Sequence, residues 1–345
     1  MENKHVVRFE PVGIEIEVDE SQTVLRAAFE QGIMLMHGCK EGQCAACKSF
    51  VLEGEDIELE KYSTFALPDF EKDEGYTLLC RAHVYEDVTI ELLNYDEEMI
   101  RSGYPIQRVT AEVVSNEPVT HDMRHLIVKL IEPRELLFFP GQYVDIAIPS
   151  TDATRSFSMA NTSSKDSGEL EFVIKVYPDG LFSHFLDKTL AVGDRLELVG
   201  PYGVFTLRDG RDCDLVFVGG GAGMAPILSV LRSLAERAST RNVVYYYGAR
   251  RKRDLCFEKE LYALEESLSN FRYIPALSEP DDQAWDGEVG LVTDVLKRHE
   301  TDLTNADCYV CGPPVMVEAA MQALSSLGAA QRRIYYDKFT TTGPA

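Results

Sequence analysis

The sequence contains no long apolar run and few basic residues, and each shortage excludes a class of protein. No uninterrupted apolar stretch approaches the ~18–20 residues that a membrane-spanning helix needs. The first eight residues lack the apolar core of a secretory signal, so we expect a cytoplasmic chain that does not engage a membrane. Lys and Arg number 34 against 57 Asp and Glu, which gives a net charge of −23. This charge argues against nucleic acid as a partner, because the acidic chain and the phosphate backbone would repel each other.

The composition indicates packed domains with redox or metal chemistry. Hydrophobic residues make up 45% of the 345 residues, a length that suggests two or three domains. Eight cysteines in a cytoplasmic chain point to metal or redox roles rather than to structural disulfides. Residues 1–100 hold 23 acidic and 8 basic residues, a balance of −15. This segment is either a solvated acidic face or a docking surface for a basic protein partner.

Hydrophobic patterning divides the chain into three predicted domains. Residues 1–98 begin with an alternating hairpin and a short helix, and residues 94–105 resemble a linker. Residues 104–207 contain short strands separated by turns, which predicts an antiparallel barrel or sandwich. Strands and helices alternate over residues 210–345, which predicts a parallel α/β sheet. The tail at residues 336–345 is expected to be too short for another element.

The strongest motif is a group of cysteines with the spacing C-x4-C-x2-C, followed by a fourth cysteine 33 positions later. Its members are Cys39, Cys44, Cys47 and Cys80. This spacing is typical of a plant-type [2Fe–2S] site, which needs four thiolates and backbone N–H groups directed at sulfur. Gly38 and Gly42 allow the backbone to approach that closely. A structural zinc site is the alternative, although zinc ligands usually come in two closely spaced pairs.

Two short motifs in the second predicted domain suit a flavin. In Arg155-Ser156-Phe157-Ser158, the guanidinium can pair with a phosphate, the phenyl ring can cover a flavin face, and Ser158 can hydrogen-bond the ring system. Downstream, Gly180-Leu181-Phe182-Ser183 opens an expected helix over residues 181–186, whose free N–H groups could hold a pyrophosphate. An ordinary turn is the alternative explanation for the first motif.

A glycine-rich loop, residues 219–226, lies between a predicted strand and a predicted helix, where a pyrophosphate would bind. It departs from the dinucleotide fingerprint G-x-G-x-x-G because Met224 occupies the third glycine position, and no acidic residue ends the next strand. Residues 250–253 are all basic and could hold a 2′-phosphate or form a solvated loop. Cys308 and Cys311 have the spacing of a redox pair, but Cys308 falls within a strand pattern.

These motifs resemble known families over almost the whole chain. Residues 1–98 resemble a plant-type ferredoxin, which implies a β-grasp fold. The motifs R-x-[YF]-[ST], G-x-x-[ST], G-G-G-x-G-x-x-P and C-G-P-P resemble the ferredoxin–NADP reductase superfamily, with Phe157 where Tyr is common. That resemblance implies an antiparallel β-barrel domain for FAD, a parallel α/β domain for NADH, and direct roles for Ser158 beside the flavin and Cys311 beside the nicotinamide.

The same resemblance implies two sets of cofactor-binding residues. The flavin set is Arg155, Ser156, Phe157, Ser158, Ile174, Lys175, Gly180, Phe182, Ser183 and Phe339. The nicotinamide set is Gly220, Gly221, Ala222, Gly223, Met224, Cys311, Gly312 and Pro313. Phe339 is included because some relatives place a C-terminal aromatic residue near the flavin.

The expected activity is electron transfer from NADH through FAD and [2Fe–2S] to a partner, because a flavin converts a two-electron donor into single electrons. No motif for substrate oxidation is present, so oxidation is expected on another polypeptide. The domain order resembles reductase components of soluble di-iron monooxygenases, and residues 9–15, 34–39 and 93–98 resemble the reductases of alkane (propane) monooxygenases. This implies a di-iron hydroxylase partner, reached through the acidic ferredoxin domain, and a monomeric chain. The alternatives are a reductase for an aromatic hydroxylase or ring-hydroxylating dioxygenase, and a zinc-stabilised NAD-binding regulator.

Overall fold

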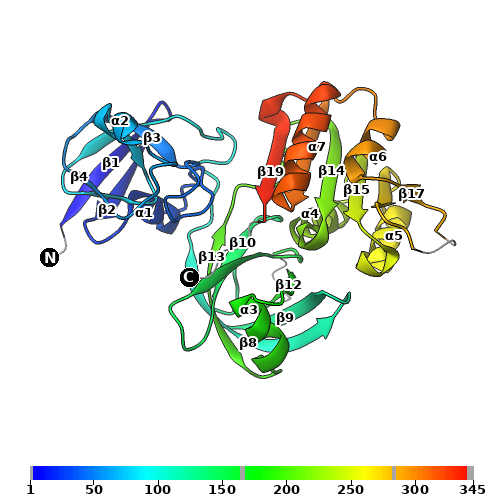
Figure 1. Cartoon of the computed structure of the whole chain (residues 1–345). Coiled ribbons are helices and arrows are strands. Elements are labelled where there is room, and N and C mark those ends of the chain that lie inside the picture. Colours follow the sequence, from blue (N-terminus) through cyan, green and yellow to red (C-terminus); the bar gives the residue numbers. More distant parts are fainter. Residues whose placement is uncertain (1–2, 164–167, 282–284, 340–345) are drawn as a thin grey trace. The chain divides into compact units, whose positions relative to one another are not determined.

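The computed structural model describes residues 3–163, 168–281 and 285–339. Contacts between residues divide the chain into two compact units (Figure 1). Unit 1 comprises residues 1–107 and 200–204, and unit 2 comprises residues 108–199 and 205–345. The predicted division at residues 207–210 falls inside unit 2 and stays a prediction.

Unit 1 is built on a five-stranded mixed sheet in the order β2-β1-β7-β3-β5, with a separate pair β4-β6. The predicted hairpin forms, and Phe9 pairs with Ile14 across it while alternate side chains are buried. The strands are β1 (Lys4–Glu10), β2 (Ile14–Asp19), β3 (Lys48–Glu53), β4 (Ile57–Leu59), β5 (Tyr76–Leu78), β6 (Ala82–Val84) and β7 (Val88–Leu92). The helices are α1 (Val24–Glu30) and α2 (Asp69–Asp73).

The segment at residues 94–105 packs against unit 1 instead of forming a free linker. Met99 and Ile100 are buried, and the Met34 amide donates a hydrogen bond to the Ile100 carbonyl at 3.0 Å. Charged and turn residues around these two apolar side chains make the segment look like a linker in the sequence. Burial of the two side chains holds it in place.

The first part of unit 2 is a six-stranded antiparallel sheet in the order β11-β10-β13-β8-β9-β12. A bridge between Met159 and Phe172 brings its two edge strands together, so the sheet closes into a barrel. The strands are β8 (Gln107–Pro118), β9 (Met123–Glu132), β10 (Tyr143–Ala147), β11 (Thr154–Ser158), β12 (Glu169–Lys175) and β13 (Arg195–Tyr202). Helix α3 (Leu181–His184) runs into a short π-helix, η1 (Phe185–Thr189), where the sequence predicts a helix.

The second part of unit 2 is a six-stranded parallel sheet in the order β17-β16-β15-β14-β18-β19. The strands are β14 (Asp214–Gly220), β15 (Val243–Ala249), β16 (Phe271–Leu277), β17 (Glu288–Val289), β18 (Ala306–Gly312) and β19 (Ile334–Lys338). The helices are α4 (Met224–Glu236), α5 (Glu258–Ser267), α6 (Val292–His299) and α7 (Pro314–Ser326), with short 3₁₀ turns η2 (Gly221–Gly223), η3 (Lys252–Asp254) and η4 (Gln331–Arg333).

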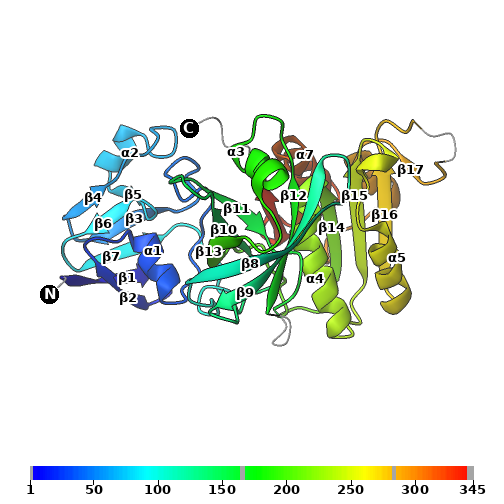
Figure 2. The same ribbon diagram turned by 90° about the horizontal axis from the view of Figure 1, so that it is seen from below.

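Helices cover both faces of this parallel sheet. Side chains of α4 and α5 share one core cluster with alternate strand residues, and side chains of α6 and α7 share another with the intervening residues. Figure 2 shows α4 in front of β14 and α7 behind it. This two-sided burial explains why the strands are apolar throughout instead of alternating.

The expectation that residues 336–345 hold no further element is wrong in its first part. Strand β19 pairs in parallel with β18, and Cys311 lies opposite Asp337. Pairing with a neighbouring strand allows a segment of only five residues to be regular. Residues 340–345 lie outside the described part of the chain.

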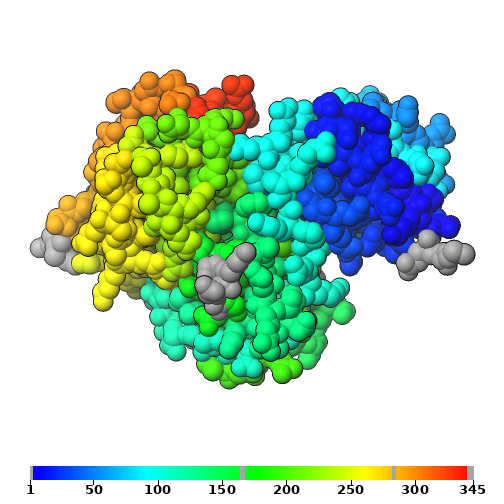
Figure 3. Space-filling view, turned by 180° about the vertical axis from the view of Figure 1, so that it is seen from behind, coloured from blue at the N-terminus to red at the C-terminus, as the bar shows by residue number. Residues whose placement is uncertain are grey.

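The barrel and the parallel sheet share apolar contacts. Met123, Ala160 and Val173 of the barrel belong to the same buried cluster as Ile227 and Leu231 of α4. In Figure 3 the surface of α4 and α5 adjoins that of the barrel. Among the described residues, no helix is both long and apolar enough to cross a membrane.

Candidate functional site

The four cysteines of the first motif lie in two pairs. The thiols of Cys39 and Cys44 share a hydrogen bond, which lowers the pKa of Cys39 to about 5 and raises the pKa of Cys44. A second shared hydrogen bond raises the pKa of Cys47 and lowers the pKa of Cys80. A [2Fe–2S] cluster has two irons and four thiolate ligands, so two pairs of thiols fit it. Within the described residues, no three His, Cys, Asp or Glu side chains are arranged to hold a single metal ion.

Backbone N–H groups are directed at the sulfur atoms, as the sequence analysis expected. The Cys39 amide donates to Cys44 Sγ at 3.2 Å. The amides of Glu41 and Gln43 donate to Cys39 Sγ at 3.4 and 3.2 Å. Such bonds stabilise the thiolate form, because they place partial positive charge beside sulfur. The loop therefore fits a cluster that thiolates hold and N–H groups tune.

Gly42 makes this loop conformation possible. Its φ is +68°, and a Cβ there would lie 2.7 Å from Tyr62 Cβ. The amide of Ser63 also donates to the Gly42 carbonyl at 3.0 Å. Both the backbone angle and the neighbouring chain therefore require a residue without a side chain.

The first flavin motif forms strand β11, and the structure brings it beside the second motif. The ring centroids of Phe157 and Phe182 lie 4.4 Å apart. Ser158 is buried at the end of the strand, and Ser156 Oγ donates to Asp145 Oδ1 at 2.6 Å. Arg155 donates to the Thr154 carbonyl at 2.8 Å and has no carboxylate partner among the described residues. Its charge is thus available for a phosphate, which fits a flavin nucleotide.

The other predicted flavin positions differ in their surroundings. Ile174 is buried in the barrel core, and Lys175 Nζ lies 2.8 Å from Asp122 Oδ2. The hydroxyl of Ser183 accepts a hydrogen bond from the Tyr177 amide at 2.9 Å. A Cβ on Gly180 would lie 2.8 Å from that hydroxyl, so the second motif is tightly folded on itself. Roles for these residues in binding FAD remain predictions.

The two nicotinamide motifs meet at the carboxyl edge of the parallel sheet. Strands β14 and β18 are neighbours, and Gly219 pairs with Cys311. A Cβ on Gly223 would lie 2.2 Å from the Cys311 carbonyl oxygen, so only glycine permits this approach. Ligands of open α/β sheets bind outside this edge. Helix α4 follows the 3₁₀ turn η2 directly, and its first turn has no side-chain cap and no acidic residue, so this end of the helix suits an anion such as a pyrophosphate.

The chain's C-terminal strand completes this edge. The Phe339 amide donates to the Gly312 carbonyl at 2.9 Å, and the phenyl ring packs against the cluster shared with the barrel. Cys311 is fully buried, and this burial raises the pKa of its thiol well above the usual value. Burial also raises the pKa of Asp337, to about 6. No local sequence motif points to Asp337, because the tail at residues 336–345 was expected to be irregular.

Two buried tyrosines that no sequence motif singled out hold the glycine-rich loop in place. Tyr247 donates from its hydroxyl to the Gly221 carbonyl at 3.1 Å, and Tyr245 donates to Met224 Sδ at 3.6 Å. A signal was present in the three consecutive tyrosines at residues 245–247. Buried hydroxyls need partners, so tyrosines in a buried strand indicate a polar contact nearby.

Carboxylates lie near two members of the basic run at residues 250–253, Arg251 and Arg253. Arg251 lies 3.6 Å from Asp281 and 3.9 Å from Glu279, and its amide donates to Asp254 Oδ2 at 2.8 Å. Arg253 also lies 3.9 Å from Asp254. These contacts partly neutralise the charge that a 2′-phosphate would need, which agrees with NADH as the reductant.

Three family models match successive parts of the chain. The match to the 2Fe-2S iron-sulfur cluster binding domain covers residues 7–85. The match to the oxidoreductase FAD-binding domain covers residues 110–207, and the match to the oxidoreductase NAD-binding domain covers residues 217–322.

Characterised relatives match along their whole length. The chain is 51% identical over 345 residues to the reductase component of propane 2-monooxygenase from Mycolicibacterium smegmatis, and the match covers 99% of both chains. It is 38% identical over 338 residues to the reductase component of phenol 2-monooxygenase from a Pseudomonas species, covering 97% of this chain and 94% of that one.

A solved structure, the cytochrome P450 reductase GcoB of Amycolatopsis, resembles the chain with a TM-score of 0.88 and 30% identity, and the match covers 98% of this chain and 99% of that one. The ferredoxin reductase in carbazole 1,9a-dioxygenase has a TM-score of 0.77 and 27% identity, with 99% of both chains covered.

Proposed function

The chain belongs to the family of oxygenase reductase components that combine a [2Fe–2S] domain with FAD-binding and NAD-binding domains, and we propose that its partner is the di-iron hydroxylase of a propane monooxygenase. The reductase activity, with NADH, FAD and a [2Fe–2S] cluster, follows from the family. The observation that carries the choice of partner is the 51% identity along the whole chain to a propane 2-monooxygenase reductase.

When bound, FAD would link the two-electron chemistry of NADH to the one-electron chemistry that a [2Fe–2S] cluster requires. In the proposed assignment, the Arg155 guanidinium binds a flavin phosphate and Phe157 packs on the flavin. The glycine-rich loop that precedes α4 holds the pyrophosphate of NADH, and Gly223 keeps that loop against Cys311. Ser158 and Cys311 are the residues proposed to contact the reacting rings.

The proposed docking surface for the hydroxylase is the cluster-binding side of unit 1. Phe65 is 95% exposed, and it lies in the short segment whose Ser63 amide bonds to the Gly42 carbonyl of the cluster loop. Phe70 is also exposed. Aromatic side chains are enriched at the centre of protein interfaces. The acidic balance of residues 1–100 would attract a basic patch on the partner.

The direct test is reconstitution with purified hydroxylases. With a propane-oxidising hydroxylase and NADH, we expect NADH consumption to match the formation of hydroxylated propane. Product formed only with a phenol hydroxylase would favour the second candidate, which the 38% identity to a phenol 2-monooxygenase reductase supports. The variant Cys44→Ser is the internal control. It should still reduce ferricyanide with NADH and should fail to reduce any hydroxylase.

We also propose that the chain is a monomer and acts in the cytoplasm. None of the eight cysteines forms a disulfide, as is usual in reducing surroundings. Sedimentation of the FAD-loaded protein at a mass close to 38.7 kDa would support the monomer, and twice that mass would refute it.

A further inference from the structure

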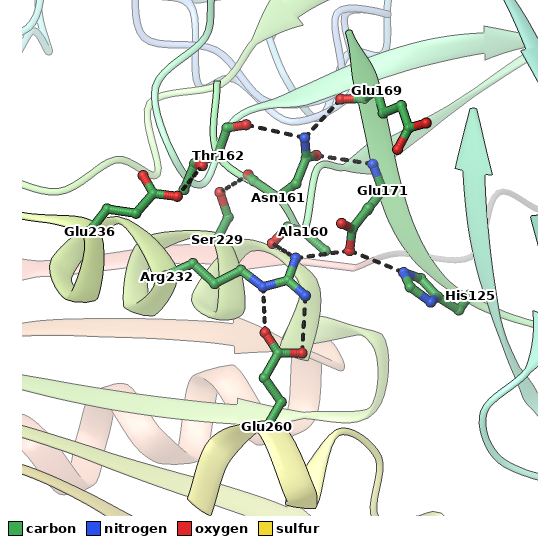
Figure 4. A network of polar contacts seen from close by, with 10 residues as sticks. All are labelled: His125, Ala160, Asn161, Thr162, Glu169, Glu171, Ser229, Arg232, Glu236 and Glu260. Carbon is green, nitrogen blue, oxygen red and sulfur yellow. Dashed lines mark hydrogen bonds and ion pairs between the residues drawn. The ribbon is translucent and has the colours of Figure 1, made fainter. Parts of the chain in front are cut away.

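One face of helix α4 carries polar side chains that reach the barrel (Figure 4). Ser229, Arg232 and Glu236 are spaced three and four residues apart, which places them on the same side of a helix. The hydroxyl of Ser229 donates to the Asn161 carbonyl at 2.5 Å, and Thr162 Oγ1 donates to Glu236 Oε1 at 2.6 Å. The helix is therefore bonded to the segment that leaves strand β11.

Arg232 makes the most bonds in this group, and its side chain is largely buried. Its guanidinium donates to both carboxylate oxygens of Glu260 on α5, at 2.6 and 3.0 Å. The same group donates to the Ala160 carbonyl at 3.0 Å and to Glu171 on β12 at 2.8 Å. A planar guanidinium with several fixed donors holds its partners in one geometry, which a lysine ammonium cannot do.

The barrel side of this network is itself fixed. Burial alone would raise the pKa of Glu171, but the hydrogen bond from His125 at 3.2 Å and the Arg232 charge lower the pKa to about 2. Glu171 is thus a charged partner for Arg232 at neutral pH. The Asn161 side chain bonds the Glu169 carbonyl at 2.8 Å and accepts from the Glu171 amide at 3.0 Å.

The network joins the two ends of the candidate site. Ala160 follows the buried Ser158 of the flavin motif by two residues, and α4 begins at Met224, directly after the glycine-rich loop. Ala160 and Val173 also share a buried cluster with α4, so polar and apolar contacts act on the same elements. A shift of α4 against β11 would alter the distance between the two rings that react.

We propose that Arg232 is a positioning residue for hydride transfer: by holding α4 and α5 against the end of β11 and against β12, it sets the spacing between the nicotinamide and flavin sites. This inference rests on the reduction of FAD by NADH and does not depend on the identity of the hydroxylase. Displacements of about 1 Å can cost about a hundredfold in rate, because the reacting atoms must lie in near contact.

The experiment compares Arg232→Ala and Arg232→Lys with Arg237→Ala, a matched control at the end of the same helix. Arg237 makes an exposed ion pair with Asp209 at 2.8 Å and does not contact the barrel in the described residues. For each FAD-loaded variant, the limiting rate of flavin bleaching at saturating NADH is measured by stopped flow. Hydrogen exchange of the backbone over residues 158–162 and 224–236 is measured separately, without NADH.

We expect Arg232→Ala to lower the limiting rate at least tenfold and to speed exchange in both segments. Arg232→Lys should recover part of the rate, and Arg237→Ala should match the wild type in both measurements. A folded Arg232→Ala protein with a normal limiting rate overturns the proposal. If that variant does not fold, Glu260→Gln and Ser229→Ala replace it, and normal rates in both overturn the proposal. Reconstitution with hydroxylases tests a different proposal. If the wild-type protein failed to reduce every hydroxylase, the proposed partner would be refuted, but the inference about Arg232 would stand.

Discussion

At the scale of single residues, Cys308 and Cys311 show how one residue type takes two roles in one strand. Both are fully buried in β18. Cys308 packs in the cluster with α6 and α7, whereas Cys311 packs in the cluster with α4 and α5. Side chains three positions apart on a strand point to opposite faces, so these thiols do not form the redox pair that their spacing suggests.

This difference predicts that Cys311→Ala slows hydride transfer roughly tenfold to a hundredfold while Cys308→Ala leaves it unchanged. Each change removes the same atoms from a buried position, but only Cys311 lies beside Gly219 and the glycine-rich loop. Stopped-flow bleaching of the flavin by NADH measures the rate. Equal losses in both variants would mean that a general packing defect, not contact with the nicotinamide, explains the effect.

At the scale of elements, the cluster loop depends on its backbone conformation as much as on its thiols. Gly42 and Gly13 both have positive φ, +68° and +60°. A left-handed conformation costs roughly 1–2 kcal/mol for a residue with a side chain. At Gly13, in the turn after β1, a Cβ would meet nothing within 4 Å, whereas at Gly42 it would meet Tyr62 at 2.7 Å.

Gly42→Ala is therefore expected to lose more than half of its iron, and Gly13→Ala is expected to keep a full complement. The conformational cost is shared by both variants, so the difference isolates crowding in the cluster loop. Iron and sulfide analysis of each purified protein, with the visible spectrum, measures cluster content. A full cluster in Gly42→Ala would show that the loop can move away from Tyr62.

Contiguous motifs made much of this fold and site predictable. Local patterns predict the hairpin of β1 and β2, most barrel strands and the strand–helix alternation. Three of the cluster cysteines lie in one loop, and the fourth lies at a single later position. Strand β19 was missed because its pairing with β18 is not local. The Arg232 contacts were missed for the same reason, since Ala160 and Glu171 lie 72 and 61 residues away in the chain.

At the scale of the whole molecule, negative charge is concentrated in one part of the chain. Residues 1–100 carry a balance of −15 out of a total of −23. Most of the carboxylates are exposed, and some form surface pairs such as Lys4–Glu17 at 3.1 Å. Single exposed pairs contribute little to stability, so the main effect of this charge concerns encounters with other molecules.

Reduction of the hydroxylase should therefore slow as salt rises, by roughly tenfold between low salt and about 0.5 M. Dissolved ions shorten the range over which the acidic residues attract a basic patch. The rate constant for reduction of the hydroxylase is measured at several salt concentrations. Flavin bleaching at saturating NADH, which needs no partner, is the control and should stay constant. A flat profile for the hydroxylase would remove the acidic docking surface from the proposed function.

The bond between the Phe339 amide and the Gly312 carbonyl also bears on how the protein should be handled. A linker attached to strand β19 would therefore lie next to the loop at residues 311–314. A tag at the N-terminus would instead precede strand β1, in a different unit. Attachment to resins or electrodes for NADH-driven biocatalysis should accordingly use the N-terminal end.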